Sequence, residues 1–129
     1  GANINMDMMG HRTKGDRIFQ INAGSTESSW NVAQVALHAA KIHAPEWDIK
    51  VRHPWSKESY ITQTDAMLFD YAGYTTILIN EHMNLSRRAN PYYHQSQDTY
   101  EKVDLDYAIS QTKVAIETAA RMAELGFRE

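Results

Sequence analysis

The sequence contains no cysteine among its 129 residues, so disulfide bonds, cysteine-ligated zinc and cysteine nucleophiles are all excluded. It also lacks an apolar run of the roughly 18 residues that a membrane-spanning helix needs. Basic residues are not in excess, since 13 Lys and Arg stand against 16 Asp and Glu, and no nucleic-acid partner is expected. The remaining composition, with 43% apolar and 22% charged residues, is typical of one folded globular domain.

Several catalytic motifs are missing as well. There is no His-Glu-x-x-His, which rules out the thermolysin-type zinc arrangement. There is no Gly-x-Ser-x-Gly and no phosphate-binding loop, which leaves serine-hydrolase and nucleotide functions without support. An initiator methionine and a signal peptide are also missing, and the first residues already have the pattern of a strand. We therefore expect the natural N-terminus to lie upstream of Gly1.

Strand and helix patterns alternate along the chain. Short runs of apolar and β-branched residues predict strands, and apolar residues at helical spacing predict helices. The expected strands are 4–8, 17–22, 47–51 and 75–80, and the expected helices are 30–43, 66–72 and 105–125. This order implies a single α/β domain, a three-layer sandwich around a mostly parallel sheet. The irregular segment 81–103 is long for a compact domain, and such segments are often functional.

Cap and core positions of the helices follow from the same patterns. Ser28 or Ser29 is expected to cap the first helix, Thr64 or Asp65 the second, and Asp104 the third. The third helix is expected to bury one apolar stripe against the sheet. The members of this stripe are Leu105, Ala108, Ile109, Thr112, Ile116, Ala119 and Ala123.

Two residues are candidates for metal binding. Asp7 interrupts an apolar run at the end of a strand, where a carboxylate needs a metal ion, an arginine or backbone N–H groups as its partner. His94 lies in the irregular segment, and neutral imidazole is the commonest metal ligand. Asp98 lies four residues further on. It either accepts a hydrogen bond from the ring N–H of His94 that does not face the metal, or it simply holds the loop in place. Each residue by itself is more often structural than metal-binding.

Three segments occur in a fixed order before the last helix: NMDMMG, TDAMLFDYAGYTTILI and YYHQSQDTYEKVD. Each alone is a weak signal, and as an ordered set they are fairly specific. Together they resemble the C-terminal half of the di-zinc aminopeptidase family, which includes bacterial leucyl aminopeptidases, glutamate carboxypeptidase and glutaminyl cyclase. The resemblance covers nearly the whole chain. It implies the phosphorylase/hydrolase-like fold of zinc exopeptidases, with residues 1–129 as the C-terminal portion of one catalytic domain.

The resemblance also implies roles for individual residues. Asp7 corresponds to an aspartate that binds one zinc ion, and His94 to the histidine that binds the other. Tyr93 takes a position where some members place a tyrosine that stabilises the oxyanion of the reaction. Asp65 matches the aspartate of a Ser-Asp-His segment whose histidine is alanine here, and Asp65 and Asp98 are expected to support the ligands.

The remaining parts of the family's active site lie upstream of the NMDMMG strand. They include a Glu-Glu pair whose first member is the general base, and this chain contains no Glu-Glu pair. The resemblance therefore implies a zinc aminopeptidase that acts on peptides with two zinc ions, present here as an N-terminally truncated and inactive fragment. We expect apolar surface exposed by the truncation to favour a homo-oligomer, and the resemblance favours a secreted or periplasmic location.

Two alternatives to an aminopeptidase stay open. One is a non-enzymatic binding or scaffold domain, as the transferrin receptor is within this family, and the retention of Asp7 and His94 disfavours it. The other is an acyltransferase of the glutaminyl cyclase type. Those enzymes typically carry tryptophan before the histidine, so Tyr93 favours a peptidase.

Overall fold

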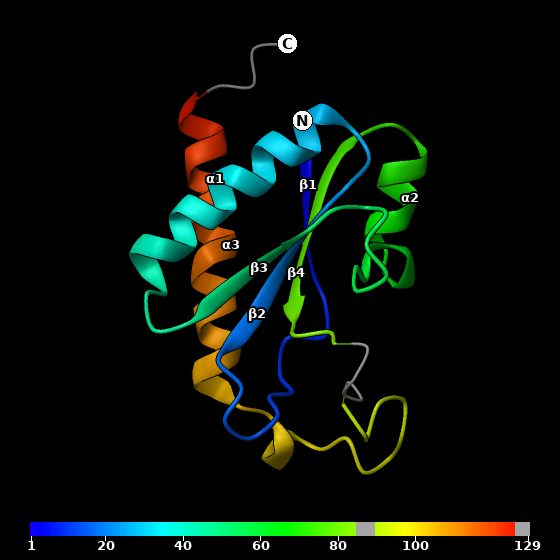
Figure 1. Cartoon of the computed structure of the whole chain (residues 1–129), viewed down its shortest axis with the longest axis vertical. Helices are drawn as coiled ribbons and strands as arrows, with labels where there is room; N and C mark the ends of the chain where they lie inside the picture. Colours follow the sequence, from blue (N-terminus) through cyan, green and yellow to red (C-terminus); the bar gives the residue numbers. More distant parts are fainter. Residues whose placement is uncertain (85–89, 126–129) are drawn as a thin grey trace.

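The structure is a computed structural model, and it describes residues 1–84 and 90–125 (Figure 1). Every expected strand and helix is present, with boundaries shifted by three residues or fewer. The strands are β1 (Ala2–Met6), β2 (Ile18–Ala23), β3 (Asp48–Arg52) and β4 (Thr75–Glu81). The α-helices are α1 (Glu27–His43), α2 (Ala66–Tyr71) and α3 (Leu105–Leu125), and two short 3-10 helices are η1 (Ile61–Gln63) and η2 (Tyr100–Lys102).

The four strands form one sheet in the order β1-β4-β2-β3. The pairs β1–β4 and β2–β3 are parallel, as expected, whereas the central pair β2–β4 is antiparallel, so the sheet is mixed. As a consequence the C-terminal ends of β1 and β4 lie at one end of the sheet, and those of β2 and β3 lie at the opposite end (Figure 1). Loops that leave these two ends of the sheet can therefore build two separate sites.

Helices cover both faces of the sheet, which confirms the three-layer architecture. The long helices α1 and α3 pack on one face around the main core, and α2 lies on the other face with η1 (Figure 1). Side chains along β4 alternate between the two faces: Ile77 and Ile79 join the main core, and Leu78 joins a small cluster with Ile61 and Ala66. No helix in the described part of the chain is long and apolar enough to cross a bilayer.

The cap of α1 differs from the expected one. Thr26 precedes the helix, and its Oγ1 accepts a hydrogen bond from the backbone N–H of Ser29 at 3.1 Å. The prediction of Ser28 or Ser29 was wrong because Thr26 carries the same capping group one turn earlier. The expected cap of α3 is confirmed, since Asp104 Oδ1 accepts from the N–H of Tyr107 at 3.1 Å.

The buried stripe of α3 was predicted wrongly. Leu105, Ile109 and Ile116 are 47%, 48% and 64% exposed. Polar residues lie on the buried face because most of their polar atoms find partners there: Ser110 Oγ accepts from the indole N–H of Trp47 at 2.7 Å, and the Thr118 hydroxyl donates to the carbonyl of Val114 at 2.6 Å. The buried residues of α3 are Tyr107, Ser110, Gln111, Val114, Ala115 and Thr118.

Candidate functional site

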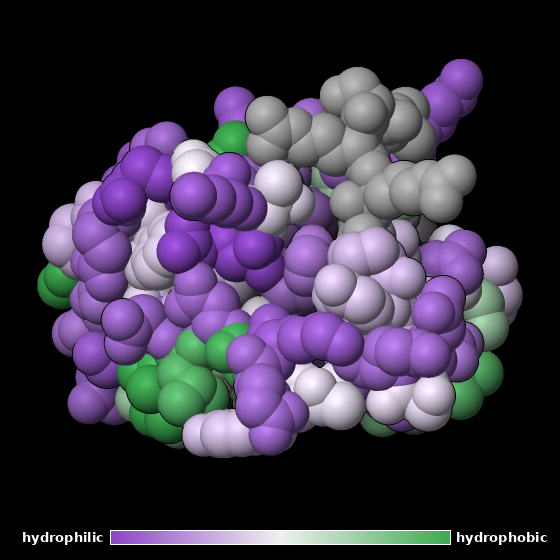
Figure 2. Space-filling view, turned by 90° about the horizontal axis from the view of Figure 1, so that it is seen from below, coloured by the Kyte–Doolittle hydropathy of each residue, from purple (hydrophilic) through white to green (hydrophobic). Residues whose placement is uncertain are grey.

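A pocket of about 330 Å³ opens where β1 and β4 end. Three segments line it: Asp7, Met8, Gly10 and His11 after β1, Glu81 at the end of β4, and residues from 90 to 103. Figure 2 looks onto this end of the molecule, and its surface is largely hydrophilic. Carboxylates, imidazoles and hydroxyls thus gather in one concave place, which suits a site for a polar ligand or a metal ion.

Asp7 is the first residue after β1 and is exposed to solvent. β1 ends at Met6, two residues before the expected end of the strand, so Asp7 lies just outside the strand and its side chain is not desolvated. Its charge therefore carries no burial penalty and is directed to the pocket that it lines.

The loop that carries Asp7 is fixed by contacts with β4 and α3. The backbone N–H of Glu81 donates to the carbonyl of Met8 at 2.8 Å, and Glu81 Oε2 accepts from the N–H of His11 at 2.8 Å. Gln111 Nε2 donates to the carbonyl of Met9 at 2.9 Å. These hydrogen bonds fix the loop that carries Asp7, and a ligand-binding carboxylate needs such a fixed position.

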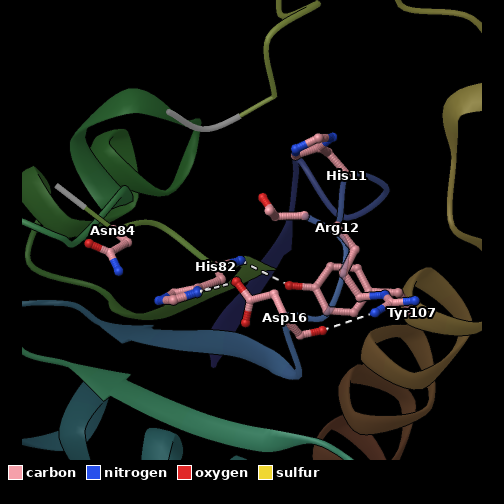
Figure 3. A pocket seen from close by; sticks show the side chains of 7 residues that line it. His11, Arg12, Asp16, His82, Asn84 and Tyr107 are labelled. Carbon is pink, nitrogen blue, oxygen red and sulfur yellow. Dashed lines mark hydrogen bonds and ion pairs between the residues drawn. The ribbon is translucent and has the colours of Figure 1, made fainter. Parts of the chain in front are cut away.

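The continuation of this loop belongs to a polar network that lines a small hollow next to the Asp7 pocket (Figure 3). Arg12 forms an ion pair with Asp104 at 2.7 Å and donates to the carbonyl of Asp16 at 3.0 Å. The Asp16 carboxylate lies 2.6 Å from Nδ1 of His82, and the His82 N–H donates to the Tyr107 hydroxyl at 2.9 Å. Burial raises the pKa of Tyr107, so its hydroxyl stays protonated. The network joins the loop after β1, the end of β4 and α3 into one frame.

Tyr93 and His94 lie together in the segment that follows β4. Their rings are stacked with centroids 3.8 Å apart, both residues are exposed, and both line the pocket. His94 has a φ of 57°, in the left-handed region that residues other than glycine adopt mostly under local constraint. Asp98 also lines the pocket, and Asn90 Nδ2 donates to its Oδ1 at 3.1 Å. The predicted roles of these residues stay predictions.

Asp65 lies away from this pocket. It is exposed, immediately precedes α2, and is not among the residues that line the pocket. Its side chain makes no capping hydrogen bond, and the Thr64 hydroxyl donates to the carbonyl of Ile61 at 3.1 Å instead. Asp65 therefore holds the expected N-cap position of α2 without a side-chain capping hydrogen bond, and its supporting role stays a prediction.

Glu81 is a residue of the pocket that the sequence analysis did not single out. It is only 6% exposed, and burial raises its pKa to about 7, with the charges of Asp98 and Asp7 adding to the effect. Burial and the charge of Glu81 also raise the pKa of Tyr60. Burial lowers the pKa of His11, against the opposing effect of Asp98. The only signal in the sequence was a carboxylate directly after a β-branched strand.

Glu81 is expected to make the stability of the metal-free chain depend on pH. A carboxyl whose folded-state pKa is raised stabilises the fold fully below its unfolded pKa, and this contribution is lost as the pH rises through about 7. Between pH 4 and 8 the loss amounts to at most about 3.5 kcal/mol, because the pKa is raised from 4.5 to about 7 and each pKa unit is worth roughly 1.4 kcal/mol. Urea unfolding across this range measures it. The variant Glu81→Gln should flatten the profile, whereas Glu124→Gln, at an exposed position, should leave it unchanged. A Glu81→Gln profile as steep as that of the wild type would contradict the assignment.

The donors of the pocket fit zinc in type but not in number. Zinc accepts carboxylate oxygen and imidazole nitrogen, and needs four ligands in a structural site or three and a water in a catalytic one. The described residues hold no group of three or more His, Cys, Asp or Glu placed to hold a metal ion. Asp7 and His94 can therefore contribute to a zinc site but cannot complete one.

Comparison with known proteins identifies the family. The model of peptidase family M28 matches residues 1–119. A crystal structure of LapA from Legionella pneumophila superposes with a TM-score of 0.72 at 18% identity, over 95% of this chain and 32% of that chain. BSAP, a zinc aminopeptidase from Bacillus subtilis, gives a TM-score of 0.67 at 18% identity, over 95% of this chain and 28% of that chain.

The chain thus spans about a third or less of the length of these solved structures, and at this identity they show the fold alone. No match is found among curated proteins. The fold and the family expected from the sequence are both confirmed. The chain belongs to peptidase family M28.

Proposed function

We propose that the chain is the C-terminal part of the catalytic domain of a zinc-dependent aminopeptidase with a two-zinc site. The observation that carries the proposal is that Asp7 and His94, far apart in the sequence, line the same pocket at the carboxyl edge of β1 and β4. The family match supports a peptidase. The names of two solved structures of similar fold, LapA aminopeptidase and the zinc aminopeptidase BSAP, support the finer assignment.

In this proposal each of these residues has a separate role. Asp7 binds one zinc ion and His94 the other; Asp98 supports these ligands from within the pocket, and Asp65 would support them from outside it. A bound zinc pair supplies an activated water and polarises the substrate carbonyl. The Tyr93 hydroxyl donates a hydrogen bond to the oxyanion that develops on that carbonyl. The other ligands and the general base come from residues outside this chain.

The same proposal gives a role to the uncovered side of the molecule. Within the described residues β1 pairs with β4 alone, so its outer edge is open. Nearby, Ala2 and Ile4 of β1 and Ala119 and Met122 of α3 line an apolar hollow of about 310 Å³. We propose that the rest of the catalytic domain covers this surface. In the isolated chain a second copy would cover it, because exposed apolar surface of this kind drives association.

An aminopeptidase is expected to require a free amine on its substrate. The full-length protein should hydrolyse leucine p-nitroanilide at least about tenfold faster than its N-acetyl derivative, because the free amine of the substrate would be bound beside the metal ions. Release of nitroaniline measures both rates. Removal of zinc with a chelator should abolish the reaction, and added zinc should restore it. Equal hydrolysis of the acetylated substrate, or activity that resists the chelator, would contradict the proposal.

A further inference from the structure

A second pocket, of about 300 Å³, lies at the opposite edge of the sheet, where β2 and β3 end. It is lined by Gly24 to Glu27 at the start of α1, by Trp30, and by His53 to Trp55 after β3. The pairing of β2 with β4 sets Ala23 opposite Ile77 and Phe19 opposite Glu81. This pocket is therefore separated from the Asp7 pocket by the length of the strands.

Three aromatic rings form one wall of this second pocket. The rings of Trp30 and His53 are stacked at 4.2 Å with an angle of 8° between their planes, and those of His53 and Trp55 at 4.4 Å with an angle of 12°. Trp55, at the outer end of the stack, is 78% exposed. A single exposed indole is unremarkable, but a stack of three rings holds the outer indole in place before any ligand arrives.

The charges around the stack favour a cation. Glu27 lines the pocket, and no lysine or arginine is among the described residues that line it. The N-terminus of α1 does not favour an anionic ligand, because groups of the chain already occupy it. Thr26 caps the helix, and the Asp70 carboxylate accepts hydrogen bonds from the Ser25 N–H at 2.6 Å and from the Ser25 hydroxyl at 2.8 Å. Asp70 can lie this close to Ser25 because residue 24 is a glycine: a Cβ at Gly24 would lie 2.7 Å from Asp70 Oδ1.

Another tryptophan of the chain, Trp47, shows that an indole ring can bind guanidinium groups. Arg12 and Arg17 place their guanidinium groups over the ring of Trp47, at 5.4 and 5.5 Å from its centroid. In the described part of the chain no cation lies over the ring of Trp30 or Trp55 in this way. Planar guanidinium stacks on indole better than ammonium does.

We propose that the stack of Trp30, His53 and Trp55, with the carboxylate of Glu27, is a binding site for the guanidinium group of an arginine side chain on a peptide or protein partner. The guanidinium lies against the exposed face of the Trp55 indole and Glu27 balances its charge. The site is independent of the proposed peptidase function, because it shares no residue with the Asp7 pocket.

The test is a titration of the folded, ¹⁵N-labelled chain with N-acetyl-arginine amide, followed through the indole N–H signals of its three tryptophans. The signals of Trp30 and Trp55 should shift in a saturable way. The signal of Trp47 should stay in place, because its indole N–H is bound to Ser110 Oγ at 2.7 Å and its ring is already covered. N-acetyl-citrulline amide, which has the same shape without the charge, should cause no saturable shift.

Two variants identify the residues responsible. Trp55→Leu should abolish the shift at Trp30, and Glu27→Gln should weaken binding by roughly two- to fivefold, as expected for one exposed charge pair. The proposal is overturned if arginine amide leaves both signals unmoved, if citrulline amide binds as well as arginine amide, or if methyl glucoside alone shifts them, which would make the stack a sugar platform. Glu124→Gln, on α3, removes one charge elsewhere and should leave the affinity unchanged.

Discussion

The purified 129-residue chain, supplied with zinc, is expected to hydrolyse aminoacyl p-nitroanilides at least about 10²-fold more slowly than a complete zinc aminopeptidase assayed beside it. The proposed function places the general base in a Glu-Glu pair, and the chain contains no such pair. Loss of a general base alone typically costs about 10²–10⁴-fold. The described residues also provide no complete set of metal ligands.

Weak zinc binding is expected together with this inactivity. In our proposal Asp7 and His94 bind different ions of the pair, and no carboxylate of this chain bridges them. Two cations without a shared carboxylate repel each other, and each has too few ligands. Turnover close to that of the complete enzyme, lost on His94→Ala, would show that other residues of this chain complete the site.

Replacing Ile79 with alanine is expected to reduce the free energy of unfolding by about 2–5 kcal/mol. Ile79 is fully buried in β4, which lies between β1 and β2, and it joins the core between the sheet and the long helices. Removing its outer carbon atoms loses burial of apolar surface and leaves a cavity that a strand paired on both sides cannot close. Urea unfolding followed by circular dichroism measures the change.

The matched control is Ile116→Ala on α3. Ile116 is 64% exposed, so the same substitution there should change the stability by no more than about 0.5 kcal/mol. Equal losses at both positions would mean that Ile116 is covered in solution, for instance by a second copy of the chain. A loss below about 1 kcal/mol at Ile79 would contradict the packing of β4 described above.

Local patterns were sufficient to predict the elements of the fold but not their pairing. The strand that became β4 has a β-branched run, and α3 has a cap and a long helical period, so both are predictable from neighbours in the sequence. The antiparallel pairing of β2 with β4 depends on contacts between distant segments, which no local pattern encodes. The buried face of α3 was missed for a related reason: Gln111 and Ser110 appear as surface residues until their partners Met9 and Trp47 are known.

The candidate site was predicted in part. Asp7 and His94 were singled out through the ordered motifs of the family, and the pocket that both line follows from β1 and β4 ending at the same end of the sheet. Their role as zinc ligands stays a prediction. Glu81 was not found, because its importance comes from burial against the loop after β1 and from the N–H of His11. Those contacts exist only in the folded chain.

The zinc content of the full-length protein tests the central claim most directly. Elemental analysis after exhaustive dialysis should find two zinc ions per chain in the wild type and in His38→Ala, whose imidazole belongs to α1 and lies outside the Asp7 pocket. Asp7→Asn and His94→Ala should each lose at least one ion, because each removes a ligand from a different zinc. Two zinc ions retained in both variants would contradict the assignment of Asp7 and His94 as zinc ligands.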